Sequence, residues 1–200
     1  MFLARHRAYS LAVAPDGLLL AARAVSSDAP PDIVRMRFKD GNRAARLAAL
    51  NPLSAKVNYF VGNDPKKWRC DVPLYSRVRA ENVYPGIDAV YYGRGDDLEF
   101  DLVVWPGADP ARIRLTYDGV NKFALDAEGN LLIHARAGMF IQRVPHVFQA
   151  VGGSKKHVPA RYVIDANKEV RIHLAGYDAS RLLVIDPVLE FASYLGGSNS

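Results

Sequence analysis

The stretch that most constrains the fold of this chain runs from Val57 to Phe100, because it combines many aromatic residues with repeated turn-forming ones. It holds one of the two tryptophans, five of the ten tyrosines and the single cysteine. Gly62-Asn-Asp-Pro65, Val72-Pro73 and Tyr84-Pro-Gly86 interrupt it, and a long helix could not contain such interruptions. The stretch therefore predicts aromatic strands joined by fixed turns.

The same strand pattern continues on both sides of this stretch. A first hairpin is expected to turn at Pro15-Asp16-Gly17, and further strands are expected over 34–38, 57–61, 74–80, 87–92, 98–104, 113–117, 123–125, 131–133, 139–143, 146–150, 158–164, 170–174 and 182–185. The only candidate helix is two turns over Arg43–Leu50, closed by Asn51-Pro52. Strands that recur about every 8 to 12 residues favour an all-β antiparallel sandwich over a parallel α/β fold.

The domain organisation follows from these strands. We expect a β-sandwich lobe over residues 1–118, and over 119–188 either a second β-rich lobe or a continuation of the same sandwich. At 200 residues and 50% hydrophobic content, the chain can bury a sizeable core without a disulfide or a metal. Because strand-like sequence begins so close to Met1, we also expect the N-terminus to be truncated. The apolar patch Leu11–Ala14 is too short for a signal peptide.

Charge and hydropathy exclude two classes of partner. The net charge of +5 comes from 26 basic and 21 acidic residues scattered along the chain. A nucleic-acid binder would gather basic residues into a stripe or a motif, so we predict no nucleic-acid partner. No run approaches the roughly 18 apolar residues of a membrane-spanning helix, so no membrane span is predicted.

The best enzymatic candidate is the acidic cluster of Asp96, Asp97, Glu99 and Asp101. In a strand, Glu99 and Asp101 would point to one face about 7 Å apart, within the separation of about 6.5–9.5 Å of an inverting glycosidase pair. Their alternation with apolar residues equally describes the polar face of a half-buried strand, and the sequence shows no cleft. We predict no catalytic residue, and keep a glycoside hydrolase that uses Glu99 and Asp101 as an alternative.

Exposed aromatic rings could bind a glycan or a protein partner, because flat rings give a large contact area at low entropic cost. The candidate ligand-binding residues are Trp68, Tyr75, Tyr92 and Trp105. The other interpretation is that these tyrosine-rich strands pack in the core, with Trp68 in its basic surroundings as the exposed exception. A carbohydrate-binding module therefore stays open as a second alternative.

No metal or cofactor is predicted. The five histidines form no close pair with the spacing of zinc ligands. Asp126, Glu128 and Asn130 place oxygen ligands at alternate positions but lack the further acidic ligand of a calcium loop, and a hairpin turn needs no ion. Cys70 has no partner for an internal disulfide and is interpreted as a passive residue.

Several motifs in order resemble one known family, and together they cover nearly all of the chain. They are Asn58-Tyr-Phe-Val-Gly-Asn-Asp-Pro65, Trp68-Arg69, Val72-Pro73-x-Tyr75, Val83-Tyr-Pro-Gly-Ile-Asp88, Val90-Tyr-Tyr-Gly93, Leu98-Glu-Phe-Asp101, Pro106-Gly-Ala-Asp-Pro110 and Leu183-Val-Ile-Asp-Pro187. The chain is similar to the uncharacterised domain that precedes seven-bladed β-propeller (SBBP) repeats in large exported bacterial proteins.

This resemblance implies a location and a partner. It implies an extracellular or cell-envelope protein in which the domain supports β-propeller repeats, and it implies no activity that can be assigned to a residue. Leu189–Ser198 resembles the entry into a first repeat, so we expect residues 189–200 to be a poorly docked linker into a propeller that is absent here. The resulting hypothesis is a non-catalytic structural or interaction module with a possible glycan or protein partner.

Overall fold

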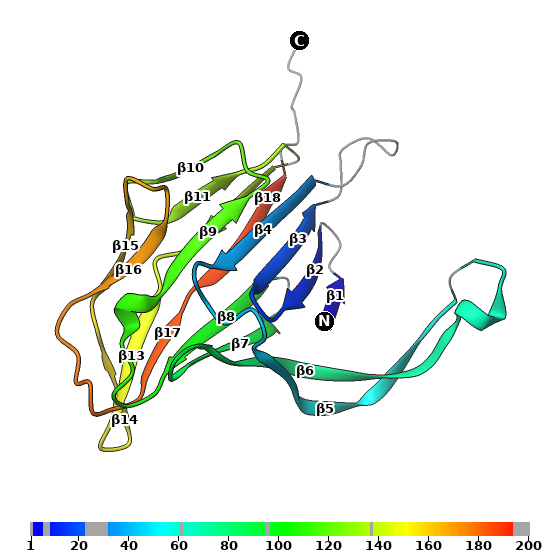
Figure 1. Ribbon diagram of the computed structural model, residues 1–200, viewed down its shortest axis with the longest axis horizontal. Coiled ribbons are helices and arrows are strands. Elements are labelled where there is room, and N and C mark those ends of the chain that lie inside the picture. Colours follow the sequence, from blue (N-terminus) through cyan, green and yellow to red (C-terminus); the bar gives the residue numbers. More distant parts are fainter. Residues whose placement is uncertain are drawn as a thin grey trace, which may run out of the picture.

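The structure is a computed structural model that describes residues 2–5, 9–22, 32–60, 62–94, 97–136 and 138–193. Its described residues form two antiparallel sheets that pack face to face as a sandwich, which confirms the predicted fold class (Figure 1). The only helical segments among them are two short 3₁₀ turns, η1 (Pro65–Lys67) and η2 (Pro110–Arg112).

The smaller sheet has seven described strands and the larger has eleven. In spatial order the smaller sheet contains β1 (Phe2–Arg5), β2 (Tyr9–Ala14), β3 (Gly17–Ala22), β4 (Asp32–Phe38), β9 (Arg114–Asp118), β16 (Val170–Leu174) and β15 (Ala160–Ile164). The larger sheet contains β5 (Arg46–Tyr59), β6 (Arg69–Tyr84), β7 (Ile87–Arg94), β8 (Asp97–Val104), β10 (Lys122–Leu125), β11 (Leu131–His134), β12 (Gly138–Gln142), β13 (His146–Val151), β14 (Ser154–His157), β17 (Leu183–Asp186) and β18 (Val188–Ser193).

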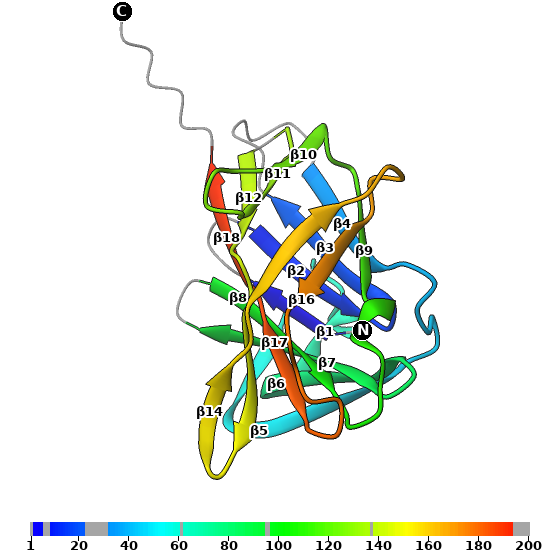
Figure 2. The same ribbon diagram turned by 90° about the vertical axis from the view of Figure 1, so that its left-hand side faces the viewer.

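In the larger sheet, two extended segments of the chain are each divided into two consecutive strands at a proline. β17 and β18 run in succession, separated by Pro187, and β12 and β13 are separated by a short segment that ends at Pro145. β17 pairs with β8 and β13, whereas β18 pairs with β8 and β12. The prolines interrupt both strands at neighbouring places because proline cannot donate a ladder hydrogen bond. The sheet therefore divides there, with β14 on one branch and β11 and β10 on the other (Figure 2).

The core lies between the two sheets and is built from the apolar positions of the alternating strands. Its largest fully buried side chains are Phe100, Phe140, Leu18, Leu20, Met36, Ile87, Leu102, Ile113, Leu115, Leu131, Ile133 and Leu183. Both sheets and both halves of the sequence contribute to this list. Strands on either side of Gly119 thus belong to one continuous sandwich.

A buried polar chain crosses the interior. Tyr117 donates a hydrogen bond to Gln142 Oε1 (2.7 Å), Gln142 Nε2 donates to the Tyr162 hydroxyl (2.8 Å), and that hydroxyl donates to the carbonyl of Arg143 (3.1 Å). Gln142 lies on the larger sheet and both tyrosines on the smaller one. Because buried polar groups are costly unless paired, this chain specifies how the two sheets face each other.

Two local expectations were wrong. Residues 43–50 do not form a helix: from Arg46 onward they belong to β5, because Leu47 packs against the core opposite Ala80, and this tertiary contact outweighs the helix propensity. Val72-Pro73 is not a corner, since β6 continues through Pro73, where the strand is an edge and needs no N–H donor.

The expectation of a poorly docked linker over residues 189–200 was also wrong for residues 189–193. Residues 189–193 lie in β18, and Leu189 is buried between the sheets opposite Gln142 and Leu98. Burial of this side chain in a strand that bridges β8 and β12 holds the segment in the larger sheet. Residues 194–200 lie outside the described residues.

Candidate functional site

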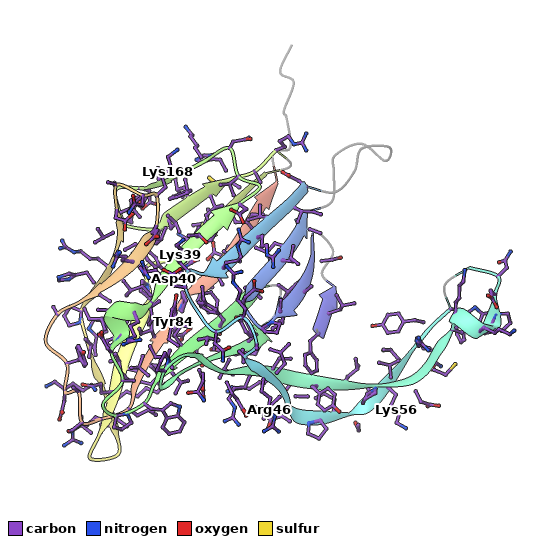
Figure 3. The ribbon with its side chains drawn as sticks, viewed as in Figure 1. Lys39, Asp40, Arg46, Lys56, Tyr84 and Lys168 are labelled. Atoms are coloured by element: carbon purple, nitrogen blue, oxygen red, sulfur yellow. The ribbon has the colours of Figure 1, made fainter. Side chains whose placement is uncertain are left out.

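The most prominent feature of the surface is the distal part of the β5–β6 hairpin. β7 pairs with β6 only as far as Arg77, so the described residues 51–60 and 62–76 continue beyond it as a two-stranded ribbon, which we call the arm. Figure 1 shows the arm projecting away from the sandwich. In Figure 3, Arg46 lies at its root and Lys56 well along it. With about nine residues per strand, the arm reaches about 30 Å.

The sequence of β5 explains why the arm is extended. Leu53, Ala55, Val57 and Tyr59 alternate with polar residues, and Val57 lies opposite Val72 of β6. Such alternation is typical of a strand with one buried face. Yet within the arm, among the described residues, no side chain is buried, and Leu53 is 49% exposed. The arm therefore has the apolar alternation of a strand pair with one buried face, although none of its described side chains is buried.

Irregular pairing shapes the arm midway along it. The register shifts between Pro52 and Lys56 and again between Val57 and Tyr59, and Asp71 has a positive φ of 54°. Asn58 Oδ1 accepts a hydrogen bond from the Asp71 N–H (2.8 Å), and Lys56 pairs with the Asp71 carboxylate at 4.0 Å. These bulges, held by side-chain contacts, bend and twist the ribbon.

The tip of the arm combines aromatic and basic side chains. Asp64 caps η1 by accepting from the Lys66 N–H (3.0 Å), and the Trp68 indole donates to the Gly62 carbonyl (3.1 Å). Phe60 packs edge-on against Trp68 with ring centroids 5.1 Å apart and is 59% exposed. The exposed cations around these rings are Lys66, Lys67 and Arg69. The aromatic pair and the neighbouring cations are therefore exposed at the end of the arm.

The four predicted ligand-binding rings lie in different surroundings. Trp68 is at the tip, whereas Tyr75 is nearer the root of the arm, edge-on to Phe2 with centroids 6.3 Å apart. Tyr92 lies on β7, where it donates to Asp101 (2.9 Å), and Trp105 follows β8 and donates to Asp88 (3.2 Å). Each ring contacts a different neighbour, so the structure does not bring the four together as one platform.

The predicted carboxylate pair lies on β8, on the face of the larger sheet that points away from the core. Glu99 is buried and Asp101 half-buried, while Phe100 between them faces the core. Burial raises the pKa of Asp101 to about 6; the Tyr92 hydrogen bond opposes that shift, and the nearby Asp186 carboxylate adds to it. The Arg77 guanidinium covers the Tyr92 ring at 4.7 Å from its centroid. The pair is thus embedded among strand side chains.

Asp186, which was not predicted as a site residue from the sequence, also belongs to this cluster. Asp186 follows Ile185, which pairs with Leu102, and so it lies across from Asp101. His146 pairs with Asp186 on the other side, and its ring lies 6.2 Å from that of His157. The registers of β17 with β8 and with β13 place Asp186 across from Asp101 and from His146, and sequence spacing does not reveal these registers. The described residues contain no group of three or more side chains suited to hold a metal ion.

A separate cavity of about 170 Å³ lies where the loop after β4 meets the end of β6. Its lining residues are Asp40, Asn42, Val83, Tyr84, Pro85, Arg112 and Arg114. Arg114 bridges Asp40 (2.7 Å) and Glu169 (3.3 Å), and Figure 3 shows Lys39, Asp40 and Tyr84 near one another there. Because the Arg114 charge is already paired, the cavity is a small polar depression at a structural corner.

Comparisons with known proteins give one match. A family model described as Domain of unknown function (DUF7948) matches residues 1–188. No curated protein and no solved structure matches the chain. Within the described residues, no helix is long and apolar enough to cross a membrane.

Proposed function

The chain belongs to the DUF7948 family, and we propose that it is a non-catalytic interaction module whose contact element is the β5–β6 arm. The observation that carries this proposal is the arm itself: a ribbon that extends from the sandwich with exposed apolar and aromatic side chains along its length. A two-stranded hairpin is marginally stable alone in water. Binding to a partner would cover those side chains and stabilise the ribbon.

The charge of the arm indicates how a partner would be recognised. Asp71 is paired with Lys56, and Asp64 caps η1, so the basic residues of the tip exceed its free carboxylates. The Phe60–Trp68 pair in their midst is the kind of aromatic anchor that carries binding energy in interfaces. A protein partner that meets the tip would therefore offer an acidic rim around an apolar recess.

The resemblance to domains that precede β-propeller repeats supports a more specific version of this proposal. In it, the module acts at the cell surface or in secreted proteins, and the arm contacts propeller repeats of its own polypeptide. A glycan partner is a further option, for which Trp68 supplies an exposed ring. Glycan-array binding that is lost in Trp68→Ala and retained in Trp105→Ala would favour the glycan.

The arm can be removed to test the proposal. Leu50 lies opposite Arg77, so replacing Asn51–Ser76 with Asn-Gly closes β5 and β6 by a two-residue turn. We expect this arm-less variant to keep its thermal unfolding midpoint within a few degrees. Lysine cross-linking in cells that make the natural protein should link Lys66 and Lys67 to a protein segment outside residues 1–188.

Lys155 and Lys156 provide the internal control. They lie on the exposed β14 at another edge of the larger sheet, and their cross-links should be the same with and without the arm. The proposal is wrong if Lys66 and Lys67 react with the cross-linker as readily as Lys155 and Lys156 do but yield no reproducible cross-link. In that case the arm has no partner.

A hydrolase is the second candidate function, and the raised pKa of Asp101 favours it. A carboxyl group with a pKa of about 6 beside Glu99 and Asp186 resembles the unequal carboxylates of a general acid–base pair. Release of reducing sugar from a panel of polysaccharides, abolished in both Asp101→Asn and Glu99→Gln, would support the hydrolase and overturn the non-catalytic assignment.

A further inference from the structure

We propose that His146 and His157 together bind one Zn²⁺ or similar transition-metal ion between β13 and β14. Phe148 of β13 lies opposite His157 of β14, and His146 precedes Phe148 by two positions, so the three side chains point to the same face of the larger sheet. Val147 between them is buried in the core, so this is the outer face. Both imidazole rings are exposed, and their centroids are 6.2 Å apart.

The distance between the two rings suits one bound ion. A Zn–N bond is about 2.0–2.1 Å long, which places the centroid of each ligating ring about 3.2 Å from the ion. Two imidazoles on one tetrahedral ion then have centroids about 5.2 Å apart. The observed separation of 6.2 Å is only slightly larger. Because both side chains are exposed, rotation about their own bonds brings the nitrogens together without moving the strands.

The charges around the pair favour a cation. Asp186 of β17 lies opposite His146, and Asp101 of β8 follows across the sheet. Burial raises the pKa of Asp101 and the Asp186 carboxylate adds to that shift, so negative charge accumulates beside the histidines. On β14, Lys155 is directed at the Phe148 ring, 4.0 Å from its centroid, and offsets part of this charge. The remaining carboxylate charge attracts a metal ion to the pair.

Asp186 also fixes how His146 presents its ring to the ion. A ligating histidine commonly donates its second N–H to a carboxylate, which leaves the other nitrogen free for the metal. Residues directly opposite in antiparallel strands have Cβ atoms about 4.5–5.5 Å apart, so the Asp186 carboxylate is within reach of this ring. The described residues contain no group of three metal ligands. Water therefore completes the shell, and binding is weaker than at a structural zinc site with four protein ligands.

Imidazole ligands determine which ions compete for the site. Neutral imidazole suits Zn²⁺, Ni²⁺ and Cu²⁺, whereas Mg²⁺ and Ca²⁺ prefer oxygen ligands. We expect Cu²⁺ to bind more tightly than Zn²⁺, and an excess of Mg²⁺ or Ca²⁺ to leave Zn²⁺ binding unchanged. Displacement of Zn²⁺ by Ca²⁺ would assign the ion to the carboxylates of β8 and β17 and would overturn the proposal.

Calorimetric titration of the full chain with Zn²⁺ tests the pair. We expect one ion per chain. His146→Asn and His157→Asn should each weaken binding at least about ten-fold, because the two rings hold the same ion and loss of even an outer-shell partner has an effect of this size. His173→Asn is the matched control: His173 is exposed on β16 of the smaller sheet, opposite Arg161, and its replacement should leave binding unchanged. Two ions per chain, or weakening in only one of the two variants, overturns the proposal.

Nuclear magnetic resonance of the histidine rings locates the ion independently of affinity. A small amount of Cu²⁺ should broaden the ring signals of His146 and His157 and leave those of His134 and His173 sharp. Equal broadening of all four would mean unspecific binding and would overturn the proposal. The arm-less variant should bind Zn²⁺ as the full chain does, so this site is tested separately from the proposed function, which the Lys66 and Lys67 cross-links decide.

Discussion

Two tyrosines that face the interior differ in whether their hydroxyl groups are paired. The Tyr84 hydroxyl lies 2.9 Å from the Lys39 carbonyl and 3.0 Å from that of Arg114, and it accepts the Arg114 N–H at 3.2 Å. Burial raises the pKa of Tyr84 to about 12. The Tyr91 hydroxyl is fully buried and has no hydrogen-bond partner among the described residues. At the scale of one atom, the first hydroxyl stabilises the fold and the second costs free energy.

Phenylalanine substitutions should therefore have opposite effects at these two positions. Tyr91→Phe removes an unsatisfied buried oxygen, and we expect it to raise the free energy of unfolding by about 1 kcal/mol. Tyr84→Phe deprives the Arg114 N–H and the Lys39 carbonyl of this hydroxyl, whereas the Arg114 carbonyl still accepts the Lys39 N–H, and it should lower the free energy of unfolding by about 2 kcal/mol. Urea unfolding of the two variants measures both changes. A loss of stability in both would mean that the Tyr91 hydroxyl has a partner.

Asp101 makes the stability of the protein depend on pH. Its folded-state pKa of about 6 lies above the ordinary value of 3.8, so the folded state holds this proton more tightly than the unfolded chain does. The stabilising contribution is fully present below pH 4 and is lost as the pH rises from about 4 to 6. Above that range, the ionised carboxylate destabilises the half-buried cluster.

Asp101→Asn should consequently stabilise the protein at pH 7.5 and have little effect at pH 4. The full shift corresponds to about 3 kcal/mol, and solvent screening at this half-buried site reduces the expected gain to about 1–2 kcal/mol. Asparagine keeps an oxygen for the Tyr92 hydroxyl. Asp118→Asn, which neutralises an exposed carboxylate paired with Arg37, is the control and should change stability little. A gain of equal size at pH 4 would contradict the assigned pKa.

At the scale of elements, the polar chain through Gln142 links strands of the two sheets. Gln142→Leu would leave the buried Tyr117 hydroxyl without its acceptor, and we expect a loss of about 2–3 kcal/mol. Adding Tyr117→Phe removes the unpaired hydroxyl and should recover part of the lost free energy of unfolding. Replacing both hydrogen-bond partners by apolar groups of similar shape changes stability little. Thermal unfolding of the single and double variants measures this coupling. If the two substitutions changed stability purely additively, the polar chain through Gln142 would not couple the two sheets.

Elements that are determined by local alternation could be predicted from the sequence, whereas features that depend on long-range pairing could not. Strands such as β8 and β9 alternate strictly because one face is buried, and the pattern located them to within a residue or two. Pairing partners and register depend on contacts distant in sequence. The arm, the meeting of Asp101 with Asp186 and the position of His146 beside His157 could therefore not be predicted. For the same reason, residues 43–50 were predicted as a helix.

At the scale of the whole molecule, the chain closes its sandwich with its last described strands. β17 and β18 lie between β8 on one side and β13 and β12 on the other, in the middle of the larger sheet. The family match ends at residue 188, just after β18 begins. The segment that completes the sheet therefore extends past the end of the match.

A chain that ends at Pro187 should be much less stable than the arm-less variant, although the latter lacks more residues. Removing β18 exposes edges of β8 and β12 and uncovers the core beside Leu189, whereas the arm buries none of its side chains. We expect the shortened chain to lose its cooperative thermal transition, measured by circular dichroism. A midpoint close to that of the full chain would contradict the structural role of β18.

The central position of β17 and β18 also bears on how the protein is made. Synthesis proceeds from the N-terminal side, so these central strands are among the last of the domain to leave the ribosome. Until they emerge, the other strands of the larger sheet form three separate fragments with open edges, β5–β8, β10–β12 and β13–β14. Its folding must then wait for translation to reach the end of the domain, and a chaperone that shields those fragments meanwhile would increase the yield of native protein.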